Sequence, residues 1–140
     1  MVNWNEMNRT VIEEFRSNEG KMGGHFAGAP VLLLSTKGAR TGQQRTNPLM
    51  YLPDGDSFVV FASKGGAPTN PDWFSNLVAD SNVTVEVGAE SFEAAAVVVT
   101  DEERDRLYAQ QAELYPQFAE YERNTSRKIP VVALKHRHGS

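Results

Sequence analysis

Polar and apolar residues alternate along much of this chain, which is the pattern of half-buried β-strands. Val83, Val85 and Val87 give the clearest case, because a threonine and a glutamate separate them. Short continuous apolar runs bounded by glycine or proline indicate further strands. The predicted strands cover residues 31–36, 45–52, 57–63, 83–87, 91–99 and 130–135. Six short, mostly antiparallel strands joined by hairpins or short links favour a small closed barrel over an open sheet.

Three segments follow helical spacing instead. Apolar residues recur at near-helical intervals in residues 3–17, which predicts a helix that covers part of the core. Asn70 followed by Pro71 is a typical helix start, with asparagine as the N-cap and proline in the first turn. Thr100 and Glu103 form a capping-box pattern that opens the third helix.

The segment after this third helix is rich in aromatic residues. Pro116 breaks or kinks the chain there. Tyr115, Phe118 and Tyr121 come at spacings of three, so they share one face if the segment is helical. The tyrosines can then supply a flat wall for a bound molecule.

The chain length predicts one domain that spans residues 1–140, and no internal repeat is visible. Residues 1–19 form its N-terminal helical segment, and residues 136–140 are expected to be a disordered tail. The glycine-rich connection at residues 18–30 is long for a mere link, which is typical of functional loops.

The formal net charge of −4 argues against a general nucleic-acid binder. The charge is unevenly distributed, because residues 37–64 carry four bases and two acids. A small anionic ligand fits such a local cationic site better than a polyanion does. The sequence has no cysteine, no apolar run as long as a membrane span and no apolar leader, so we expect a cytoplasmic protein.

Standard catalytic motifs are absent from the sequence. It has no Gly-x-Ser-x-Gly elbow, no P-loop and no His-Glu-x-x-His motif. His136 and His138 lie in the expected tail and His25 has no evident partner, so no metal site is predicted. Any reaction must therefore take its chemistry from a bound cofactor.

The most informative stretch is a glycine-bracketed turn between the first two predicted strands. Gly38 and Gly42 allow the backbone to approach a bound group closely. Lys37, Arg40 and Arg45 lie in this turn and at its exit, where they suit a phosphate or a carboxylate. Taken alone, such a turn is more often a solvated hairpin loop.

Two longer stretches contain this turn and the aromatic segment. The first reads LLLSTKGARTGQQRTNPLMYLPDGDSFVVFASKGGAPTNPDWFSNLVADSNVTVEV, and the second reads VTDEERDRLYAQQAELYPQFAEYERNTSRKIPVVAL. Together they resemble the family of deazaflavin-dependent nitroreductases and quinone reductases, whose members use coenzyme F420. The likeness extends over about residues 20–135. It implies a split β-barrel with flanking helices, like that of flavin-binding oxidoreductases.

The resemblance also implies roles for particular residues. Lys37, Arg40 and Arg45 would face the phosphate-bearing, glutamate-tailed side chain of the cofactor. The 8-hydroxy-5-deazaflavin ring would lie beside the turn's exit strand. The further cofactor contacts that the resemblance implies are Thr41, Asn47, Pro48, Leu49, Ala62, Ser63, Lys64, Gly65 and Trp73.

The resulting hypothesis is an oxidoreductase that passes a hydride from reduced F420 to an electron-poor acceptor such as a quinone, an enone or a nitro compound. Tyr115, Tyr121 and the Met22–Phe26 loop would shape the acceptor pocket. Tyr115, Tyr121, Ser63 or water would donate the proton that completes the reduction. Two alternatives stay open: a deazaflavin carrier that turns nothing over, and a barrel that uses FMN.

The sequence departs from nitroreducing members at two positions. Met50 and Phe118 stand where tyrosines can occur, and a missing hydroxyl removes a hydrogen-bond donor. Cofactor binding therefore carries over better than the choice of acceptor. The expected partner is a small-molecule acceptor and not a nucleic acid; the protein can be a monomer or a homodimer, and peripheral contact with a membrane stays open.

Overall fold

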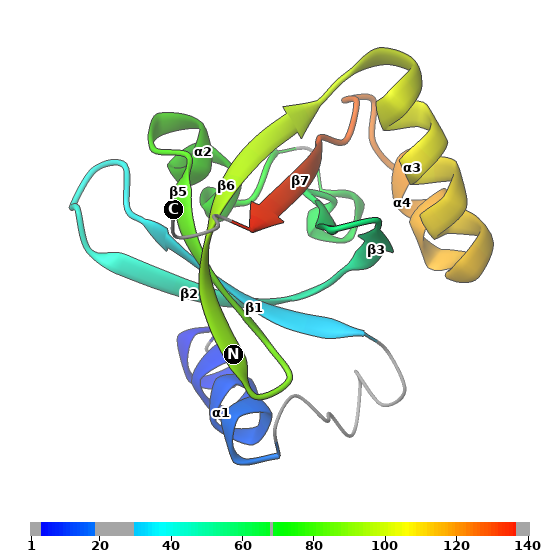
Figure 1. The fold of residues 1–140 in the computed structure, drawn as a ribbon. Coiled ribbons are helices and arrows are strands. Elements are labelled where there is room, and N and C mark those ends of the chain that lie inside the picture. The colour runs from blue at the N-terminus through cyan, green and yellow to red at the C-terminus, as the bar shows by residue number, and fades with distance from the viewer. Residues whose placement is uncertain (1–3, 19–29, 68, 137–140) are drawn as a thin grey trace.

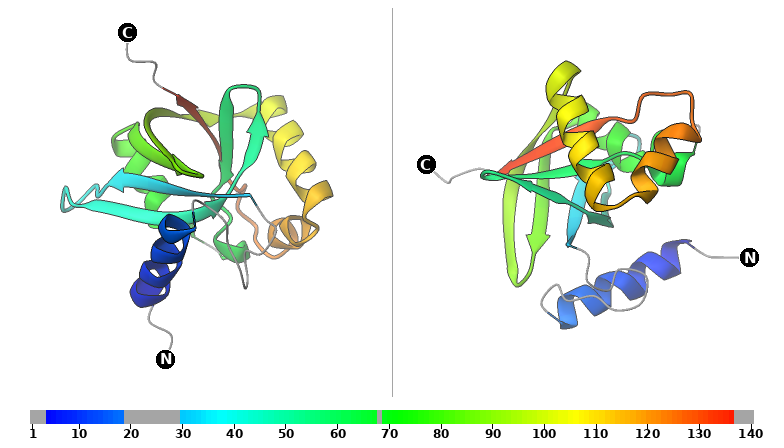
Figure 2. Two further views of the ribbon diagram at one scale, coloured as in Figure 1. Left: turned by 60° about the horizontal axis from the view of Figure 1, so that its bottom comes forward. Right: turned by 90° about the vertical axis from the view of Figure 1, so that its right-hand side faces the viewer.

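One curled antiparallel sheet organises the chain (Figure 1). The computed structural model describes residues 4–18, 30–67 and 69–136. The strands are β1 Val31–Lys37, β2 Gln44–Met50, β3 Leu52–Asp54, β4 Ser57–Phe61, β5 Asn82–Val87, β6 Glu90–Val99 and β7 Val131–His136. Their order across the sheet is β2-β1-β5-β6-β7-β4-β3, and every neighbouring pair is antiparallel. The two views in Figure 2 show this sheet curving into a half-barrel.

The two edge strands of the sheet are consecutive in the chain. Only Tyr51 separates β2 from β3, and its N–H donates to the carbonyl of Pro30 at 3.1 Å. The predicted strand at residues 45–52 is therefore two strands, because the chain bends at Tyr51 and changes partner from β1 to β4. The split barrel is confirmed with seven strands instead of six. No ladder joins its two edges in the part of the chain that the structure describes, so a fully closed barrel was the wrong expectation.

Four α-helices flank the sheet: α1 Trp4–Ser17, α2 Asp72–Ala79, α3 Asp101–Leu114 and α4 Gln117–Arg123, with a short 3-10 turn, η2, at Lys64–Gly66. The views in Figure 2 show α1 below the β1 and β2 strands, and α3 and α4 together at the opposite side. All three predicted helices are confirmed. Pro116 does separate α3 from α4, as its backbone chemistry predicts.

The helix starts differ in detail from the sequence patterns. Pro71, not Asn70, is the N-cap of α2, because the Asn70 side chain accepts a hydrogen bond from Arg127 at 2.7 Å instead. Thr100 is the N-cap of α3, yet its hydroxyl makes no capping bond. The next residue, Asp101, has a positive φ of 58° and turns the chain into the helix.

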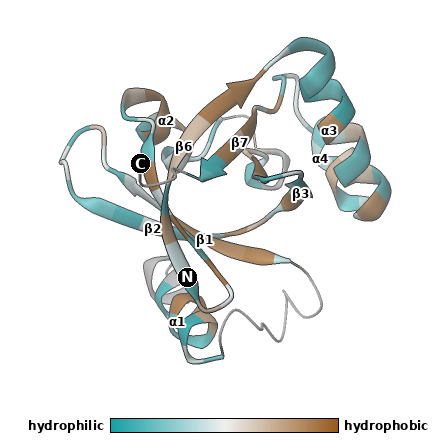
Figure 3. Cartoon of the chain, in the orientation of Figure 1, coloured by the Kyte–Doolittle hydropathy of each residue, from teal (hydrophilic) through white to brown (hydrophobic). Residues whose placement is uncertain are grey.

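Three clusters of buried apolar residues hold these elements together, and Figure 3 shows the apolar positions that run along β1, β6 and β7. The central cluster lies on the inner face of the curled sheet and includes Leu34, Val60 and Leu134. A second cluster packs α3 and α4 against the outer face of β3, β4 and β7. A third, centred on the fully buried Phe15, packs α1 against the outer face of β1.

The last strand, β7, extends one residue further than expected. His136 is the last residue of β7, and its ring stacks on Phe92 with centroids 4.3 Å apart. Assigning His136 to a disordered tail was therefore wrong, because sheet pairing with Ala94 extends the strand to this residue. Residues 137–140 and the Met22–Phe26 loop, which includes His25, lie outside the described part of the chain.

Candidate functional site

The basic turn is a tight hairpin between β1 and β2. The N–H of Gly38 donates to the carbonyl of Gln43 at 2.7 Å, and the N–H of Gly42 donates to the carbonyl of Gly38 at 2.9 Å. Gly42 has a φ of 72°, where a side chain would be strained. Arg40 and Thr41 are exposed at the tip of this hairpin. Gly42 thus supplies the positive φ that the turn needs, while close approach of the backbone to a bound group stays a prediction.

The ladder places the cations of the hairpin on two different faces of the sheet. Thr36 pairs with Arg45, so Arg45 shares the inner face with the central cluster. Lys37 pairs with Gln44 one step further along, which places Lys37 on the outer face. The sequence alone had grouped these cations around one anion.

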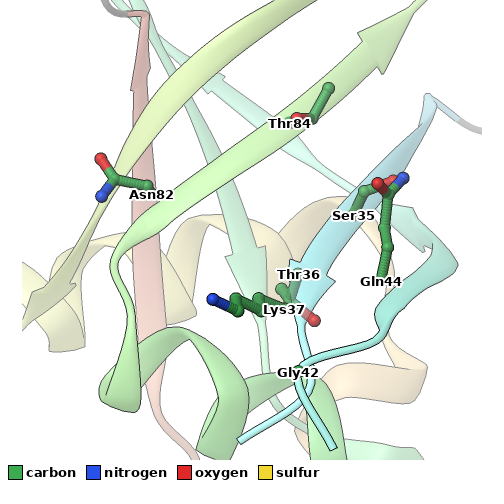
Figure 4. Close-up of a pocket in the computed structure, with 7 residues that line it drawn as sticks. All are labelled: Ser35, Thr36, Lys37, Gly42, Gln44, Asn82 and Thr84. Carbon is green, nitrogen blue, oxygen red and sulfur yellow. The ribbon is translucent and has the colours of Figure 1, made fainter.

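A polar hollow of about 250 Å³ lies on that outer face (Figure 4). Figure 4 shows the Lys37 side chain directed toward the strand that carries Asn82. The lining residues are Ser35, Thr36, Lys37, Gly42, Gln44, Asn82 and Thr84. The lining combines hydroxyl and amide groups with one ammonium group, so it can accept polar or anionic groups.

The exit strand β2 alternates between the same two faces. Arg45, Asn47 and Leu49 occupy the inner face, and Leu49 packs on the central cluster. Pro48 pairs with Leu33 and therefore lies on the outer face. The inner face thus carries a polar end at Arg45 and an apolar end at Leu49.

Helix α2 joins this hairpin to the central cluster. Trp73 is 5% exposed and belongs to the central cluster. Asn76, on the same helix, is buried and accepts a hydrogen bond from the N–H of Ala39 at 3.0 Å. Its amide nitrogen donates to the hydroxyl of Thr36 at 3.2 Å. The Asn76 side chain therefore fixes the basic hairpin to the core, and no sequence motif had indicated this.

Replacing Asn76 with alanine should loosen the basic hairpin. The change removes both hydrogen bonds and leaves the Ala39 N–H without its acceptor, which we expect to cost about 1–3 kcal/mol in the free energy of unfolding. Anion binding at the hairpin should weaken as well, because Arg40 follows the released Ala39. Chemical denaturation and ligand titration measure the two effects. Ser75→Ala, an exposed change on the same helix, should alter neither; equal losses in both variants would contradict the role of Asn76.

The cofactor contacts predicted at residues 62–65 belong to a compact turn that extends to residue 67. Ala62 and Ser63 are buried, and Lys64 is exposed with a positive φ of 47°. Gly65 lies within η2. A side chain at Gly66 would stand 3.1 Å from the backbone of Tyr121, so this turn packs directly against α4. The turn that follows Ser63 therefore packs against the helix that contains Tyr121; both are predicted catalytic residues.

Arg127 secures this turn, although no sequence signal had singled it out. Its guanidinium donates to the carbonyls of Ala62 at 3.1 Å, Ser63 at 2.9 Å and Ala67 at 2.9 Å. A fourth bond reaches the side-chain oxygen of Asn70 at 2.7 Å. Only its contacts in the structure show this role, because an arginine between polar residues in the sequence is expected at the surface.

The aromatic segment divides into a buried part and an accessible part. Phe118 is 6% exposed and its ring contacts Phe61, Tyr108 and Tyr121. Tyr115 and Tyr121 pack at the edge of the same cluster and are half-buried. The phenylalanine that departs from the family pattern is therefore a core residue.

Tyr108 differs from the other two tyrosines. Its hydroxyl donates to the carbonyl of Phe118 at 2.6 Å, and burial raises the pKa of Tyr108 to about 12. Its proton is therefore held inside the fold. Among the three tyrosines of α3 and α4, Tyr115 and Tyr121 remain the candidates for contact with a ligand.

The hairpin cations lack the ion pairs that four other basic residues form within the described part of the chain. Arg16, Arg104, Arg106 and Lys128 each form an ion pair with an acidic side chain. No ion pair is found for Lys37, Arg40 or Arg45 among residues 4–18, 30–67 and 69–136. Unpaired cations in one hairpin suit an external anion, which is the chemistry that the sequence predicts. The described residues contain no cluster of three or more potential metal ligands, and none of the described helices has the length and hydropathy to cross a bilayer.

Comparisons with known proteins agree with this geometry. Residues 6–136 match the family model described as F420H(2)-dependent quinone reductase. The chain is 40% identical over 129 residues to an F420H(2)-dependent quinone reductase of Mycobacterium tuberculosis H37Rv, covering 88% of this chain and 85% of the relative. A solved structure of an F420-H2 dependent reductase is 35% identical with a TM-score of 0.70, covering 81% of this chain and 100% of that one. Another, described as a domain-swapped dimer, is 32% identical with a TM-score of 0.72, covering 94% of this chain and 97% of that one.

Proposed function

Because this chain belongs to the F420H(2)-dependent quinone reductase family, we propose that it transfers a hydride from reduced coenzyme F420 to a quinone. The family consists of oxidoreductases that use coenzyme F420, so F420 is the cofactor and FMN was only an alternative. The observation that carries the proposal to particular residues is the basic hairpin, whose cations form no ion pair within the described part of the chain.

The residues of the hairpin fit the anionic part of such a cofactor. Arg40 is exposed at the tip, and Arg45 extends from the inner face of the sheet. Guanidinium groups bind phosphates and carboxylates through two parallel hydrogen bonds, which a single ammonium group cannot do. In this proposal Arg40 and Arg45 hold the phosphate, and Lys37 and Thr41 contribute from either side of the hairpin.

The flat part of the cofactor needs an apolar surface and a few polar groups. Asn47 and Leu49 offer these on the inner face, beside the cluster that contains Ala62 and Trp73. Pro48 lies on the opposite face, so its proposed contribution is to shape β2 and not to touch the ring. Ser63, Lys64 and Gly65 would approach from the turn at the other side of the inner face.

The bound cofactor supplies the hydride, and the protein's task is to orient the acceptor and deliver a proton. Tyr115 and Tyr121 are half-buried at the edge of α3 and α4, and Tyr121 adjoins the turn that contains Ser63. In the proposed mechanism a phenol of these tyrosines, or the Ser63 hydroxyl, protonates the reduced quinone oxygen while the surrounding aromatic rings exclude water.

Removing the two phenol hydroxyls tests the proton-donor proposal. We expect Tyr115→Phe and Tyr121→Phe, singly or together, to lower turnover about tenfold or more, because a positioned acid contributes at least that much. Cofactor affinity should stay within about twofold. Tyr108→Phe is the matched control, since its hydroxyl is bound to a backbone carbonyl inside the fold. Unchanged turnover in the double variant would remove both tyrosines from the mechanism.

The function itself is tested by two parallel measurements on the purified protein. Fluorescence titration with oxidised F420 and with FMN should give tight binding of F420 and weak binding of FMN. Mixing the protein with reduced F420 and a soluble naphthoquinone should restore the absorbance of the oxidised coenzyme. Tight binding without reoxidation by any quinone would instead favour a carrier protein.

Other acceptors, the assembly state and the location belong to the same proposal. Enones and nitro compounds share the electron-poor character of quinones, and the quinone assay extends to them directly. A homodimer is supported by the domain-swapped dimer among the similar structures. A cytoplasmic protein that reduces a lipid-soluble quinone would contact the bilayer surface peripherally.

A further inference from the structure

Arg127 connects two segments that lie far apart in the sequence. It follows α4 and precedes β7, while its four acceptors lie on residues 62–70. Three of these acceptors are backbone carbonyls, so the contact depends on the path of the turn and not on its side chains. Every nitrogen of the guanidinium is used, and the side chain is half-buried.

The turn that Arg127 holds does not have a relaxed backbone. Lys64 has a φ of 47°, which costs a residue with a β-carbon of the order of 1 kcal/mol or more. Such a conformation persists only where surrounding contacts enforce it. Arg127 binds the carbonyls of Ala62 and Ser63, immediately before the strained residue.

From these contacts we infer that Arg127 is a positioning residue of the cofactor site. It fixes the turn at residues 62–65 in the conformation that binds F420. It also keeps that turn against Tyr121, because Gly66 is in close contact with the Tyr121 backbone. The inference rests on the proposed function, in which this turn contacts the cofactor and Tyr121 faces the acceptor.

The chemistry of arginine explains why this position would not accept lysine. The guanidinium reaches Ala67 through one nitrogen, Asn70 through a second, and Ala62 and Ser63 through the third. An ammonium group is a single point of charge and cannot span acceptors in these three directions. Arg127→Lys should therefore keep the charge but lose most of the positioning.

The experiment compares Arg127 with a second arginine that stabilises the fold but lies outside the proposed cofactor site. Arg104 is 6% exposed and donates to the carbonyl of Ile129 at 2.9 and 3.1 Å, without touching the 62–70 turn. Arg127→Ala, Arg127→Lys and Arg104→Ala are titrated with oxidised F420 at a temperature where each is folded, and thermal melting records their stability. We expect about a tenfold weaker F420 affinity in both Arg127 variants. Arg104→Ala should have a lower melting temperature and unchanged affinity.

The outcomes separate the inference from the proposed function. If the wild-type protein fails to bind F420, the proposed function is wrong. If it binds and the folded Arg127 variants bind equally well, only the positioning role is wrong. Should Arg127→Ala not fold, Asn70→Ala removes a single one of the four bonds, and Arg127→Lys keeps the charge. An affinity within twofold of wild type in both of these variants would overturn the inference.

Discussion

Reversing the charge of Arg45 to glutamate is expected to weaken F420 binding by about two orders of magnitude or more. The arginine lies on the inner face of the sheet and has no acidic partner within the described residues. Two opposite charges about 4 Å apart near a protein surface interact by roughly 4 kcal/mol, and a glutamate turns this attraction into repulsion. Each loss of about 1.4 kcal/mol lowers affinity tenfold.

A matched variant separates this local effect from the change in net charge. Arg9→Glu, on the exposed side of α1, changes the total charge equally and should leave binding within about twofold. Fluorescence titration of both variants at low and high salt measures the difference. Binding by wild type should weaken as salt rises, and the Arg45 variant should lose part of that dependence. Equal affinities in the two variants would mean that the cofactor does not use the hairpin.

Truncating Leu134 to alanine should produce a large loss of stability. This side chain is fully buried in the central cluster, on the strand that lies between β6 and β4. Leucine-to-alanine changes in such cores cost about 2–5 kcal/mol, from lost burial and from the cavity that remains. For a chain of this size the melting temperature should fall by about 10 °C.

The control for this variant is a residue of the same kind outside the core. Val78 on α2 is 62% exposed, so Val78→Ala should change the unfolding free energy by no more than about 0.5 kcal/mol. Denaturant titration of both variants measures the difference. A loss below 1 kcal/mol in Leu134→Ala would show that the neighbouring strands close around the gap.

Local sequence patterns predict most elements of this fold but not the way they meet. The valine alternation in β5 and the glycines of the basic hairpin follow from short-range backbone chemistry, and both are confirmed. The bend at Tyr51 was missed, because nothing in the residues 45–52 marks where a strand changes partner. The point at which a strand changes its pairing partner depends on the whole sheet.

Helix α3 shows a second limit of pattern reading. Its buried side follows perfect helical spacing, yet two of the four positions are Arg104 and Gln111. Arg104 is satisfied by the carbonyl of Ile129 and by acidic side chains. Gln111 is fully buried, and neither of its amide atoms has a hydrogen-bond partner among the described residues; nothing there explains this. Because polar residues are expected at the surface, a pattern of apolar residues does not indicate that these two positions are buried.

The candidate site likewise contains residues that the sequence predicts and residues that it does not. Its cations and glycines were predicted from their spacing, and the family resemblance is confirmed. Asn76 and Arg127 were missed, because each forms hydrogen bonds with groups about 40 to 65 residues away in the sequence. The roles of the named site residues stay predictions until the variants above are measured.

The position of β7 in the sheet also bears on how the protein is made. This strand is the last of the seven to be synthesised, yet it lies between β6 and β4 and provides the only described ladder that joins β3 and β4 to the other strands of the sheet (Figure 1). The earlier strands therefore emerge from the ribosome as two separate groups with unpaired edges. The half-barrel is complete only once β7 has been added, so its assembly depends on contacts between distant parts of the chain. Until that moment the exposed edges of β4 and β6 are sites at which a nascent chain can aggregate or bind a chaperone.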